Sequence, residues 1–578
     1  MHRHWLVNRT NQEYLKYLSK SASISPVLAQ ILVNRGIKTA GDISSFLNSD
    51  ILQLSDPFDI QGMGTAVDRI IAASKRRENI LVHGDYDVDG LTSTAIVLKA
   101  LKILGIESDY FIPNRMEHGY GFNKPSIKRA KQVGATLIIT VDCGITSFET
   151  VSLCKKEGID VIITDHHEPL ISHESAVSRQ QAAGNSQEFL FPDAVAVINP
   201  KISNLESPVS NLSGAGIAFK LAQALLTHDS RFTSHDFLDL AALGTIADVV
   251  PITGENRLIV KEGLKLIENG ASHGLQALKK VSGTDGKGLK TGLLLFTIIP
   301  RINASGRVSD ANRVVKFLLT GSEDEAIEMA SWLEGLNSER QKIEKEVYQE
   351  ALYQLNNKGV NSVIVLSSEG WHRGVIGIVA SRIAEVFYRP AFIISVDGHV
   401  ARGSARSIPN FDIYKALAQC RNVLRGFGGH RQAAGLELDS KNISSFEEHI
   451  NRIANETLTG KDFIPQLEID ANINFSDLNF NLIREFEMLE PFGSGNPEPL
   501  LGAKGLDILY PRILKDNHLK MNLRQKNISF DAIGFNMASY FDKIGTSIKV
   551  DAVFTPCFND WEGFRSLQLN LKALRPSQ

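Results

Sequence analysis

The sequence predicts an α/β protein with a parallel sheet, a long helix leading to a second α/β domain, and a small β-barrel near the carboxyl end. Short β-branched runs, helical patterns between them and a later change to alternating strands are the observations behind this prediction. The chain has 578 residues, which is enough for several domains of the usual size of about 150 residues.

Short apolar runs in the first half of the chain predict the strands of the parallel sheet. None of them alternates with polar residues, which is typical of strands that helices bury on both faces. Helical patterns over 91–104 and 124–133 lie between the runs, at the spacing of βαβ units. The predicted strands cover residues 80–83, 137–141, 161–164 and 195–198.

A long helical pattern begins near Ser322, which has capping-box spacing to Glu325. Apolar residues then keep a period of about 3.6 until Asn356–Gly359 ends the pattern. Because a fresh apolar run follows at 363–366, we expect this helix to connect two domains. Beyond 461 the residues alternate between apolar and polar and few helical patterns occur, which predicts a small β-barrel or sandwich.

The expected organisation is a series of five segments. They are an N-terminal segment (1–50), a first α/β domain (51–320), a connecting helix (321–358), a second α/β domain (359–460) and a β domain (461–578).

The composition is that of a globular protein with nearly balanced charge. Its 62 Lys and Arg residues against 65 Asp and Glu give a net charge of −3, and 43% of residues are hydrophobic, which excludes wholesale disorder. No run approaches ~18 apolar residues and no export signal is evident, so neither a membrane span nor secretion is expected. Four scattered cysteines fit a reducing cytoplasm. A net charge near zero excludes only a uniformly basic protein that coats DNA, because affinity for nucleic acid depends on where the cationic side chains cluster.

The strongest local signal is the acidic segment His83–Gly90, which follows the first predicted strand. Its carboxylates Asp85, Asp87 and Asp89 are spaced as at the start of a calcium loop. Such a loop needs glutamate at its twelfth position, where Ile96 stands, and a helix before it, so an EF-hand is excluded. Alternate carboxylates that share one side of a turn suit hard divalent cations.

Other acidic and histidine residues follow the next predicted strands. Asp142 follows the second strand, Asp165–Glu168 follows the third, and Asp248 lies in the later segment Gly244–Pro251. A lone aspartate after a strand is more often a helix cap or turn residue. Several such segments together favour one shared site, because parallel strand ends meet at one edge of a sheet. A mixed oxygen and nitrogen site favours Mn²⁺ or Mg²⁺ over structural zinc.

The second α/β domain contains a cluster of glycine, serine and arginine suited to phosphate. It comprises Arg402–Ser407 and Gly426–His430. Glycine-rich turns expose backbone N–H groups, and arginine forms bidentate hydrogen bonds with phosphate. The segment Gly283–Gly288 lacks the ending of a P-loop and no dinucleotide-binding glycine motif follows a strand, so nucleotide hydrolysis and dinucleotide binding are not expected.

Four segments resemble, in the expected order, the motifs of the DHH phosphoesterase superfamily. They are His83–Gly90, Val141–Gly144, Asp165–His167 and Gly244–Asp248. Further segments resemble the RecJ family of bacterial single-strand-specific DNA exonucleases, so that the resemblance covers nearly the whole chain. These are Ile112–Arg115, Gly119–Gly121, Pro300–Arg307, Gly370–Gly377 and Leu489–Pro499.

The resemblance implies a site for two Mn²⁺ or Mg²⁺ ions, with Asp142 as the bridge between them. Asp85 and His167 are implied as catalytic groups, His167 either as general acid or as stabiliser of the transition state. Asp85 and His83 lie in the same acidic turn and are implied either as ligands or as groups that support the ligands. The implied metal ligands are Asp87, Asp89, Asp142, His166 and Asp248. The implied DNA and phosphate contacts are Arg115, Arg301, Arg307, Arg373, Ser404, Arg406, Gly429 and His430.

The same resemblance implies a cytoplasmic, monomeric 5′→3′ exonuclease that releases 5′-mononucleotides from single-stranded DNA during recombination and repair. Its β domain would be an OB-fold that binds the strand. The expected partners are single-stranded DNA, a single-strand DNA-binding protein and a RecQ-type helicase, with no membrane. Candidate strand contacts in the OB-fold are Lys515, Lys520, Arg524 and Lys526, although a solvated charged face explains them equally well.

Two other functions compete with this interpretation. A DHH phosphoesterase of small substrates would usually lack the β domain that begins near Leu467. A DNA-binding relative without activity should have lost metal ligands, whereas every carboxylate and histidine position of the motifs is filled here.

Overall fold

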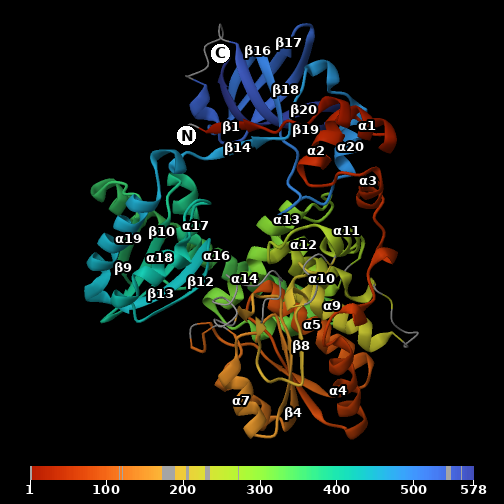
Figure 1. Ribbon diagram of the computed structural model, residues 1–578, viewed down its shortest axis with the longest axis vertical. Helices are drawn as coiled ribbons and strands as arrows, with labels where there is room; N and C mark the ends of the chain where they lie inside the picture. The colour runs from red at the N-terminus through yellow and green to blue at the C-terminus, as the bar shows by residue number, and fades with distance from the viewer. Residues whose placement is uncertain are drawn as a thin grey trace, which may run out of the picture. The chain divides into compact units, whose positions relative to one another are not determined.

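The computed structural model (Figure 1) divides into two compact units. Unit 1 comprises Met1–Gln53, Pro251–Thr253 and Pro465–Gln578, and unit 2 comprises Leu54–Val250 and Gly254–Ile464. The structure describes residues 3–115, 117–119, 121–171, 189–202, 207, 209–227, 233, 235–270, 272–541, 549–561 and 563–577. Among them, none of the helices has the length and apolar character needed to cross a membrane.

The first sheet of unit 2 is fully parallel, with strand order β3-β2-β4-β5-β8. Its strands are β2 (Asn79–His83), β3 (Ser108–Phe111), β4 (Ala135–Val141), β5 (Asp160–Thr164) and β8 (Ala196–Ile198). The strands predicted from short apolar runs are therefore confirmed, and β3 is an additional edge strand. Helices cover both faces of this sheet, which explains why the runs do not alternate with polar residues.

Helices of this first domain fall into two groups. Those next to the sheet are α4 (Met63–Arg76), α5 (Val88–Ile103), α6 (Lys124–Gln132), α7 (Phe148–Lys156) and α9 (Gly214–Leu226). Those that follow are α10 (His235–Ala247), α11 (Gly254–Asn269), α12 (His273–Val281), α13 (Thr291–Phe296), α14 (Ile298–Val308) and α15 (Asn312–Leu319). In Figure 1, α4 and α7 flank the strands β4 and β8.

The predicted connecting helix is α16 (Glu323–Lys358). Ser322 caps it, since the Ser322 side chain accepts a hydrogen bond from the amide of Glu325 (3.3 Å). Its last turns pack with α17 in one core of the second α/β domain, while α18 and α19 pack in a separate core on the other face of the sheet.

The second sheet is mixed, with order β12-β13-β11-β10-β9, and only β9 and β10 run parallel. Its strands are β9 (Ile364–Glu369), β10 (Ala391–Asp397), β11 (Val400–Arg406), β12 (Gly426–His430) and β13 (Ala433–Asp439). Its helices are α17 (Ile376–Phe387), α18 (Ile413–Gln419) and α19 (Ile443–Thr457).

Unit 1 contains a closed barrel, because β16 pairs with both β17 and β19 while β18, β20 and β19 complete the circuit. The barrel strands are β16 (Leu501–Leu514), β17 (His518–Gln525), β18 (Ile528–Gly534), β19 (Val550–Trp561) and β20 (Phe564–Pro576). The short β15 (Ala471–Asn472) pairs in parallel with the start of β16, and α20 (Phe480–Glu487) precedes the barrel. The predicted carboxyl-terminal β-barrel is thus confirmed.

The amino-terminal segment folds onto this barrel. Strand β1 (His4–Val7) pairs in parallel with β14 (Gln466–Ile469), and Figure 1 shows the two strands side by side. Helices α1 (Gln12–Ala22), α2 (Pro26–Asn34) and α3 (Ala40–Leu47) share one hydrophobic core with α20 and the barrel. Nothing in the local sequence pattern of the first fifty residues indicated this partner, because the contact joins the two ends of the chain.

The segment Leu489–Pro499 has a structural role in unit 1. The side-chain amide of Asn496, which is fully buried, donates to the carbonyls of Leu489 and Pro491, both at 2.8 Å. The carbonyl of Ser494 accepts a hydrogen bond from the amide of Ile252 (2.7 Å). This loop therefore holds the short segment Pro251–Thr253 that unit 1 takes from the middle of the chain.

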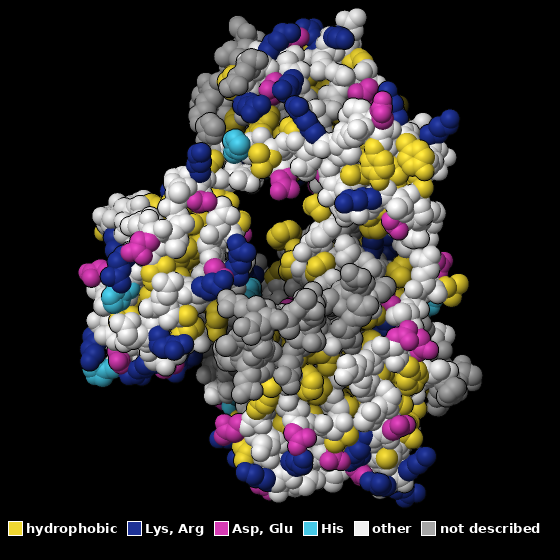
Figure 2. All heavy atoms as spheres, viewed as in Figure 1, with side chains coloured by type: hydrophobic (Ala, Val, Ile, Leu, Met, Phe, Trp, Pro, Cys, Tyr) yellow, Lys and Arg dark blue, Asp and Glu magenta, His cyan; other side chains and the backbone are white. Residues whose placement is uncertain are grey.

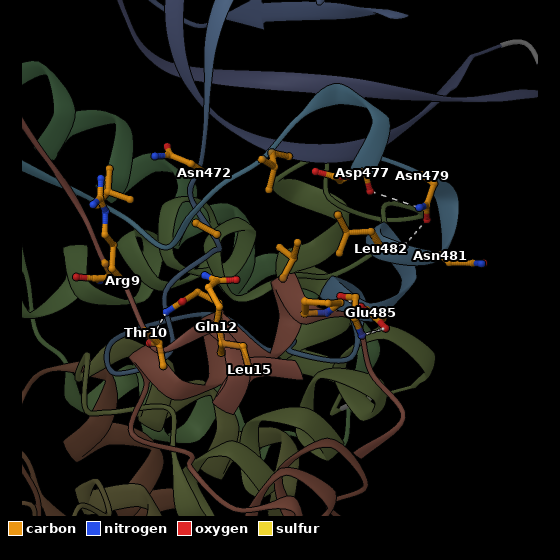
Figure 3. A pocket seen from close by; sticks show the side chains of 18 residues that line it. Arg9, Thr10, Gln12, Leu15, Asn472, Asp477, Asn479, Asn481, Leu482 and Glu485 are labelled. Atoms are coloured by element: carbon orange, nitrogen blue, oxygen red, sulfur yellow. Dashed lines mark hydrogen bonds between the residues drawn. The ribbon is translucent and has the colours of Figure 1, made fainter. Parts of the chain in front are cut away.

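A cavity of about 870 Å³ lies in unit 1 between the amino-terminal helices and α20. Figure 3 shows Gln12 and Leu15 on one side of it, and Asn481, Leu482 and Glu485 on the other. Glu485 is committed to the fold, since its carboxylate accepts from the amide of Ser25 (2.8 Å) and from the Ser25 hydroxyl.

Candidate active site

The ends of the parallel strands bring the predicted metal ligands together. Three groups of acidic and histidine residues have ligand atoms within 4.8 Å of one another. Asp142 and His166 each belong to two groups, so the three groups form one continuous cluster. The groups are Asp85–Asp87–Asp142, Asp89–His166–Asp248 and Asp142–His166–His167.

Local structure explains how the first acidic segment presents its carboxylates. Asp87 caps α5, because its side chain accepts a hydrogen bond from the amide of Gly90 (3.1 Å). Its charge therefore lies at the positive end of the helix dipole. Asp142 directly follows β4 in a left-handed conformation (φ 60°), which turns the chain at the sheet edge.

The start of α9 is a part of the site that the sequence analysis missed. The carboxylate of Asp89 accepts hydrogen bonds from the amides of Gly214 (2.7 Å) and Ala215 (2.8 Å). A Cβ added at Gly214 would lie 2.7 Å from the Asp142 side chain, so the approach requires glycine. A serine followed by small residues before an apolar helix, here Ser213–Gly216, was the signal that could have indicated this close contact.

His166 lies in the middle of the carboxylate cluster. Its Nε2 atom lies 3.1 Å from Asp142 Oδ1, 3.5 Å from Asp248 Oδ2 and 3.9 Å from Asp89 Oδ2. Burial, together with the positive charge of the neighbouring His167, lowers the pKa of His166 to about 3. Nε2 is buried and forms no hydrogen bond among the described residues. A neutral imidazole in this position is ready to bind a metal ion.

His167 has the opposite protonation state because of Asp165. Burial lowers the pKa of His167, but the hydrogen bond and charge of Asp165 outweigh this effect and raise it to about 9. Asp165 Oδ1 lies 2.7 Å from His167 Nδ1 and also accepts a hydrogen bond from the His167 amide (3.0 Å). This pKa favours the protonated form of His167 at neutral pH. Asp165 had no predicted role of its own, although it is the first residue of the Asp-His-His triplet.

The cluster carries more buried negative charge than it can neutralise by itself. Burial and neighbouring carboxylates raise the pKa of Asp89 to about 7 and that of Asp248 to about 8. The same causes raise the pKa values of Asp85 and Asp142 well above the usual range. One oxygen of Asp85 and one of Asp142 are buried with no hydrogen bond among the described residues. A site of several carboxylate oxygens and one imidazole fits Mn²⁺ or Mg²⁺.

His83 lies beneath the strand end and belongs to none of the three groups. Its fully buried ring lies between Phe111 and Phe122, with ring centroids 5.8 and 5.2 Å away, and its Nδ1 is 2.9 Å from Ser126 Oγ. Burial lowers the pKa of His83 to about 3. His83 is therefore neutral and part of the packing that supports the acidic turn.

An arginine group lies within electrostatic reach of the acidic turn. It comprises Arg115, Arg307 and Arg406. Burial and the charges of Arg115, Arg340 and Arg406 lower the pKa of Arg307 to about 10. The pKa of Arg406 is lowered by burial and by Arg115. Arg115 lies over the ring of Tyr86, with its Cζ 5.3 Å from the ring centroid. Guanidinium groups held together in this way have the charge and donors that suit an anion such as phosphate.

Arg340 of α16 was absent from the predicted site. It donates to Asn337 (2.5 Å) and Glu344 (2.6 Å) on its own helix, so one carboxylate balances it. Its charge nevertheless acts on Arg307. A buried arginine in a long helix gave no sequence signal for this proximity.

The second α/β domain supplies further predicted residues. A Cβ at Gly377 would lie 3.0 Å from Ser404 Oγ, so this glycine lets α17 approach β11 closely. Burial and the charges of Arg406 and His167 lower the pKa of His430, which places it within reach of both regions. Gly429 precedes His430 with φ 132°, a conformation that favours glycine.

Two predicted arginines have other surroundings. Burial, Arg402 and, to a smaller extent, Arg115 lower the pKa of the half-buried Arg373. Arg301 forms an ion pair with Glu334 and donates to the carbonyl of Thr297 (2.7 Å). Glu334 therefore holds the guanidinium of Arg301, which does not join the arginine group.

The basic residues of the barrel do not form one patch. Lys515 and Lys526 lie in the turns at opposite ends of β17. Lys520 lies 3.5 Å from Asp531, and Arg524 lies 3.3 Å from Asp507. On the face drawn in Figure 2, basic and acidic side chains are interspersed over the protein, in agreement with the net charge of −3.

Comparison with known proteins identifies the domain types. The sequence matches the DHH family N-terminal domain over residues 79–245, the DHHA1 domain over 359–456 and the RecJ OB domain over 469–573. These matches agree with the parallel sheet, the second α/β domain and the closed barrel described above.

Relatives match over nearly the whole chain. The single-stranded-DNA-specific exonuclease RecJ of Bacillus subtilis is 37% identical over 573 residues, which cover 98% of this chain and 70% of the relative. The protein of the same name from Escherichia coli is 31% identical over 96% of both chains. The crystal structure of Thermus thermophilus RecJ in complex with Mn²⁺ superposes with a TM-score of 0.82 at 29% identity, covering 100% of this chain and 80% of that one. This chain belongs to the RecJ family of single-stranded-DNA-specific exonucleases.

Proposed function

We propose that this protein is a metal-dependent 5′→3′ exonuclease that hydrolyses single-stranded DNA to 5′-mononucleotides. One observation carries the proposal: within unit 2, a buried carboxylate cluster lies within electrostatic reach of a group of arginines. The first region suits divalent cations and the second suits phosphate. Membership of the exonuclease family supports the reaction class.

Asp142 is the residue best placed to bridge two Mn²⁺ or Mg²⁺ ions, because it belongs to two of the three groups and its carboxylate has two oxygens. His166 also belongs to two groups but presents a single nitrogen, Nε2. Such ions neutralise charge on the phosphate under attack and lower the pKa of the attacking water. Two solved T. thermophilus RecJ structures, described as complexes with Mn²⁺ and with Mg²⁺, support this assignment. The proposed ligands are Asp87, Asp89, Asp142, His166 and Asp248.

His167 and Asp85 are the proposed catalytic groups. Protonated His167, held by Asp165, can donate to the scissile phosphate or to the 3′-oxygen that leaves with the departing nucleotide. Asp85 has a buried oxygen without a hydrogen bond among the described residues, and it lies beside Asp87 and Asp142. We propose that this oxygen orients the attacking water.

The arginine group accounts for the preference for a 5′ end. A terminal phosphate carries more negative charge than a phosphodiester, so buried guanidinium groups favour it. Arg301 is left out of the proposed set because Glu334 holds its guanidinium. The proposed phosphate contacts are Arg115, Arg307, Arg373, Ser404, Arg406, Gly429 and His430.

The OB domain is proposed to bind the strand. Tyr510 and Phe564 support this role, because their side chains are 81% exposed and aromatic rings stack on bases. The RecJ OB match over 469–573 also counts against a phosphoesterase of small substrates. Domain boundaries near residues 50, 320, 358 and 460 are proposed with this assignment.

The cellular setting is part of the same proposal. We expect a monomer that acts in the cytoplasm on single-stranded DNA, with a single-strand DNA-binding protein and a RecQ-type helicase as partners in recombination and repair. Copurification of these partners with this chain tests the partner expectation, and its mass in solution tests the monomer.

Labelled oligonucleotides test the activity. The full chain, Asp142→Asn and the control Asp560→Asn, which changes an exposed carboxylate paired with Arg565, are incubated with 5′- and 3′-labelled strands and Mn²⁺. We expect mononucleotides from the 5′ end of single strands only. Asp142→Asn should lose more than the roughly 10- to 100-fold typical of groups that merely support ligands. Digestion of duplex at an equal rate, or full activity in Asp142→Asn, contradicts the proposal.

A further inference from the structure

Helix α14 (Ile298–Val308) contains the segment Pro300–Arg307, of which the proposed function uses only Arg307. Asn303 and Gly306 of this segment have no assigned role. The helix lies close to α5 and α16 in unit 2 (Figure 1). The inference below rests on the metal and phosphate sites of the proposed function.

Three residues on one face of α14 make contacts with the two halves of the site. Asn303 Oδ1 accepts a hydrogen bond from the amide of Val88 (3.2 Å). Arg307 Nη1 donates to the carbonyl of Gly374 in the second α/β domain (3.0 Å). Gly306, which lies between them on the same face, packs against the acidic turn: an added Cβ would come within 2.6 Å of a backbone oxygen there. Positions i, i+3 and i+4 share a face of an α-helix.

The hydrogen bond of Asn303 reaches the backbone between two proposed metal ligands. Val88 is the first residue of α5, and Asp87 and Asp89 are its neighbours in the chain. The first amides of a helix have no partner within the helix, and Asp87 satisfies only that of Gly90. Without Asn303, the amide of Val88 would lose its acceptor.

The close approach of Gly306 fixes the other end of the same turn. The oxygen that its Cβ would meet is the carbonyl of Tyr86, between Asp85 and Asp87. The ring of Tyr86 lies beneath the guanidinium of Arg115. A single helix face therefore contacts the backbone of the acidic turn at two places and also carries one of the phosphate-binding arginines.

We propose that Asn303 is a positioning residue for the metal centre. It holds the backbone between Asp87 and Asp89 in the orientation that two ions require. Because Arg307 lies one helical turn further on the same face, α14 also acts as a rigid spacer between the metal ligands and the arginine group. This spacing determines which phosphodiester bond, counted from the anchored 5′ end, reaches the metal centre.

Metal binding without DNA distinguishes positioning from a DNA contact. Isothermal titration with Mn²⁺ alone is measured for the wild type, Asn303→Ala and Asn303→Asp, which keeps an acceptor oxygen for the Val88 amide. The matched control is Asn451→Ala. Asn451 Oδ1 accepts from the amide of Val363 (2.9 Å), so the control removes the same kind of hydrogen bond from the second α/β domain. Thermal unfolding of each variant reports the purely structural cost.

We expect Asn303→Ala to weaken Mn²⁺ binding roughly 10- to 100-fold, as is usual when a group supporting metal ligands is removed. Asn303→Asp should recover most of the affinity. Asn451→Ala should lose thermal stability but keep the affinity of the wild type. On a 5′-phosphorylated strand, Asn303→Ala should release dinucleotides besides mononucleotides, because the spacing is no longer fixed.

Unchanged Mn²⁺ affinity in Asn303→Ala, or an equal loss in Asn451→Ala, overturns the inference. If Asn303→Ala does not fold, Asn303→Ser, whose hydroxyl is too short to reach Val88, must show the same loss of affinity. A wild-type protein that binds Mn²⁺ but degrades no DNA refutes the proposed function, while the titrations still decide the role of Asn303.

Discussion

The metal centre and the arginine group of unit 2 are electrostatic opposites. In the metal centre, burial and neighbouring carboxylates raise the pKa of Asp248 to about 8. In the arginine group, burial and neighbouring guanidinium groups lower the pKa of Arg307 to about 10. Each region buries like charges together, which costs free energy until an opposite charge binds. In the proposed function, divalent ions and a 5′-phosphate end would supply those two charges, so each region would depend on a different ligand.

The two regions also differ in how the fold builds them. The metal ligands come from strand ends and nearby turns of one domain, where the parallel sheet brings them together. The arginines of the arginine group come from α14, β11 and the turn after β3, in two domains. The metal centre should therefore survive changes in the second α/β domain that disable phosphate binding.

Outside the proposed metal ligands, the largest effect is expected from Asp165→Asn. Without this carboxylate the pKa of His167 falls and its ring loses its orientation, so kcat should drop about 100-fold or more, as for a lost general acid. Asp165 belongs to none of the three ligand groups, so Mn²⁺ affinity should stay that of the wild type. A parallel loss of Mn²⁺ affinity would show that Asp165 belongs to the metal centre instead.

Substitution of two arginines on β11 tests the arginine group independently of the metal centre. Arg406→Ala should lower kcat/KM about 10- to 100-fold on 5′-phosphorylated strands, the usual effect of a lost charged hydrogen bond. The loss on 5′-hydroxyl strands should be smaller. Arg402 lies on the same strand but pairs with Glu437 (2.7 Å), so Arg402→Ala is the control with little effect. Equal losses of kcat/KM for both variants on both substrates would show that the arginine group does not recognise the 5′-phosphate.

A pH dependence is expected from the metal centre. The pKa values of Asp89 and Asp248 rise from 3.8 to about 7 and about 8 in the folded protein. At pH values between 3.8 and these raised pKa values, the folded state binds more protons than the unfolded state. The metal-free protein therefore loses stability as pH rises from about 4 to 8. Mn²⁺ must displace those protons, so the rise in Tm that Mn²⁺ produces should be greater at pH 8 than at pH 6. An equal rise in Tm at pH 6 and pH 8 would contradict the raised pKa values of Asp89 and Asp248.

The smallest effect is expected from Arg301→Ala. Its ion pair with Glu334 is partly buried, so the free energy of unfolding should fall by about 1–3 kcal/mol. Because Glu334 holds the guanidinium, kcat/KM should stay within about twofold of the wild type. Thermal unfolding and the exonuclease assay check both values. A large loss of activity at unchanged stability would return Arg301 to the arginine group.

Much of the metal centre could be predicted because its signals are local. An aspartate directly after a buried parallel strand lies at one known edge of the sheet, so Asp142 and His166 could be placed together from their spacing alone. The contribution of Asp165 was missed because a carboxylate that binds an adjacent histidine looks the same in sequence as one that binds a metal. The amides of Gly214 and Ala215 were missed because they reach Asp89 only through packing of α9 against α5.

By itself the sequence determined the parallel sheet, the long connecting helix, the barrel and the cluster of carboxylates, since each is encoded in hydrophobic periodicity or in residues close together in the chain. Only the tertiary structure decided between Arg301 and Arg307, which stand in the same helix. Arg301 pairs with Glu334, whereas Arg307 lies near three further arginines. Helical spacing cannot reveal those partners. The tertiary structure likewise gave the first fifty residues their place in the barrel core. The physical reason is the same in both cases: burial and charge act between neighbours in space, which packing brings together from distant parts of the chain.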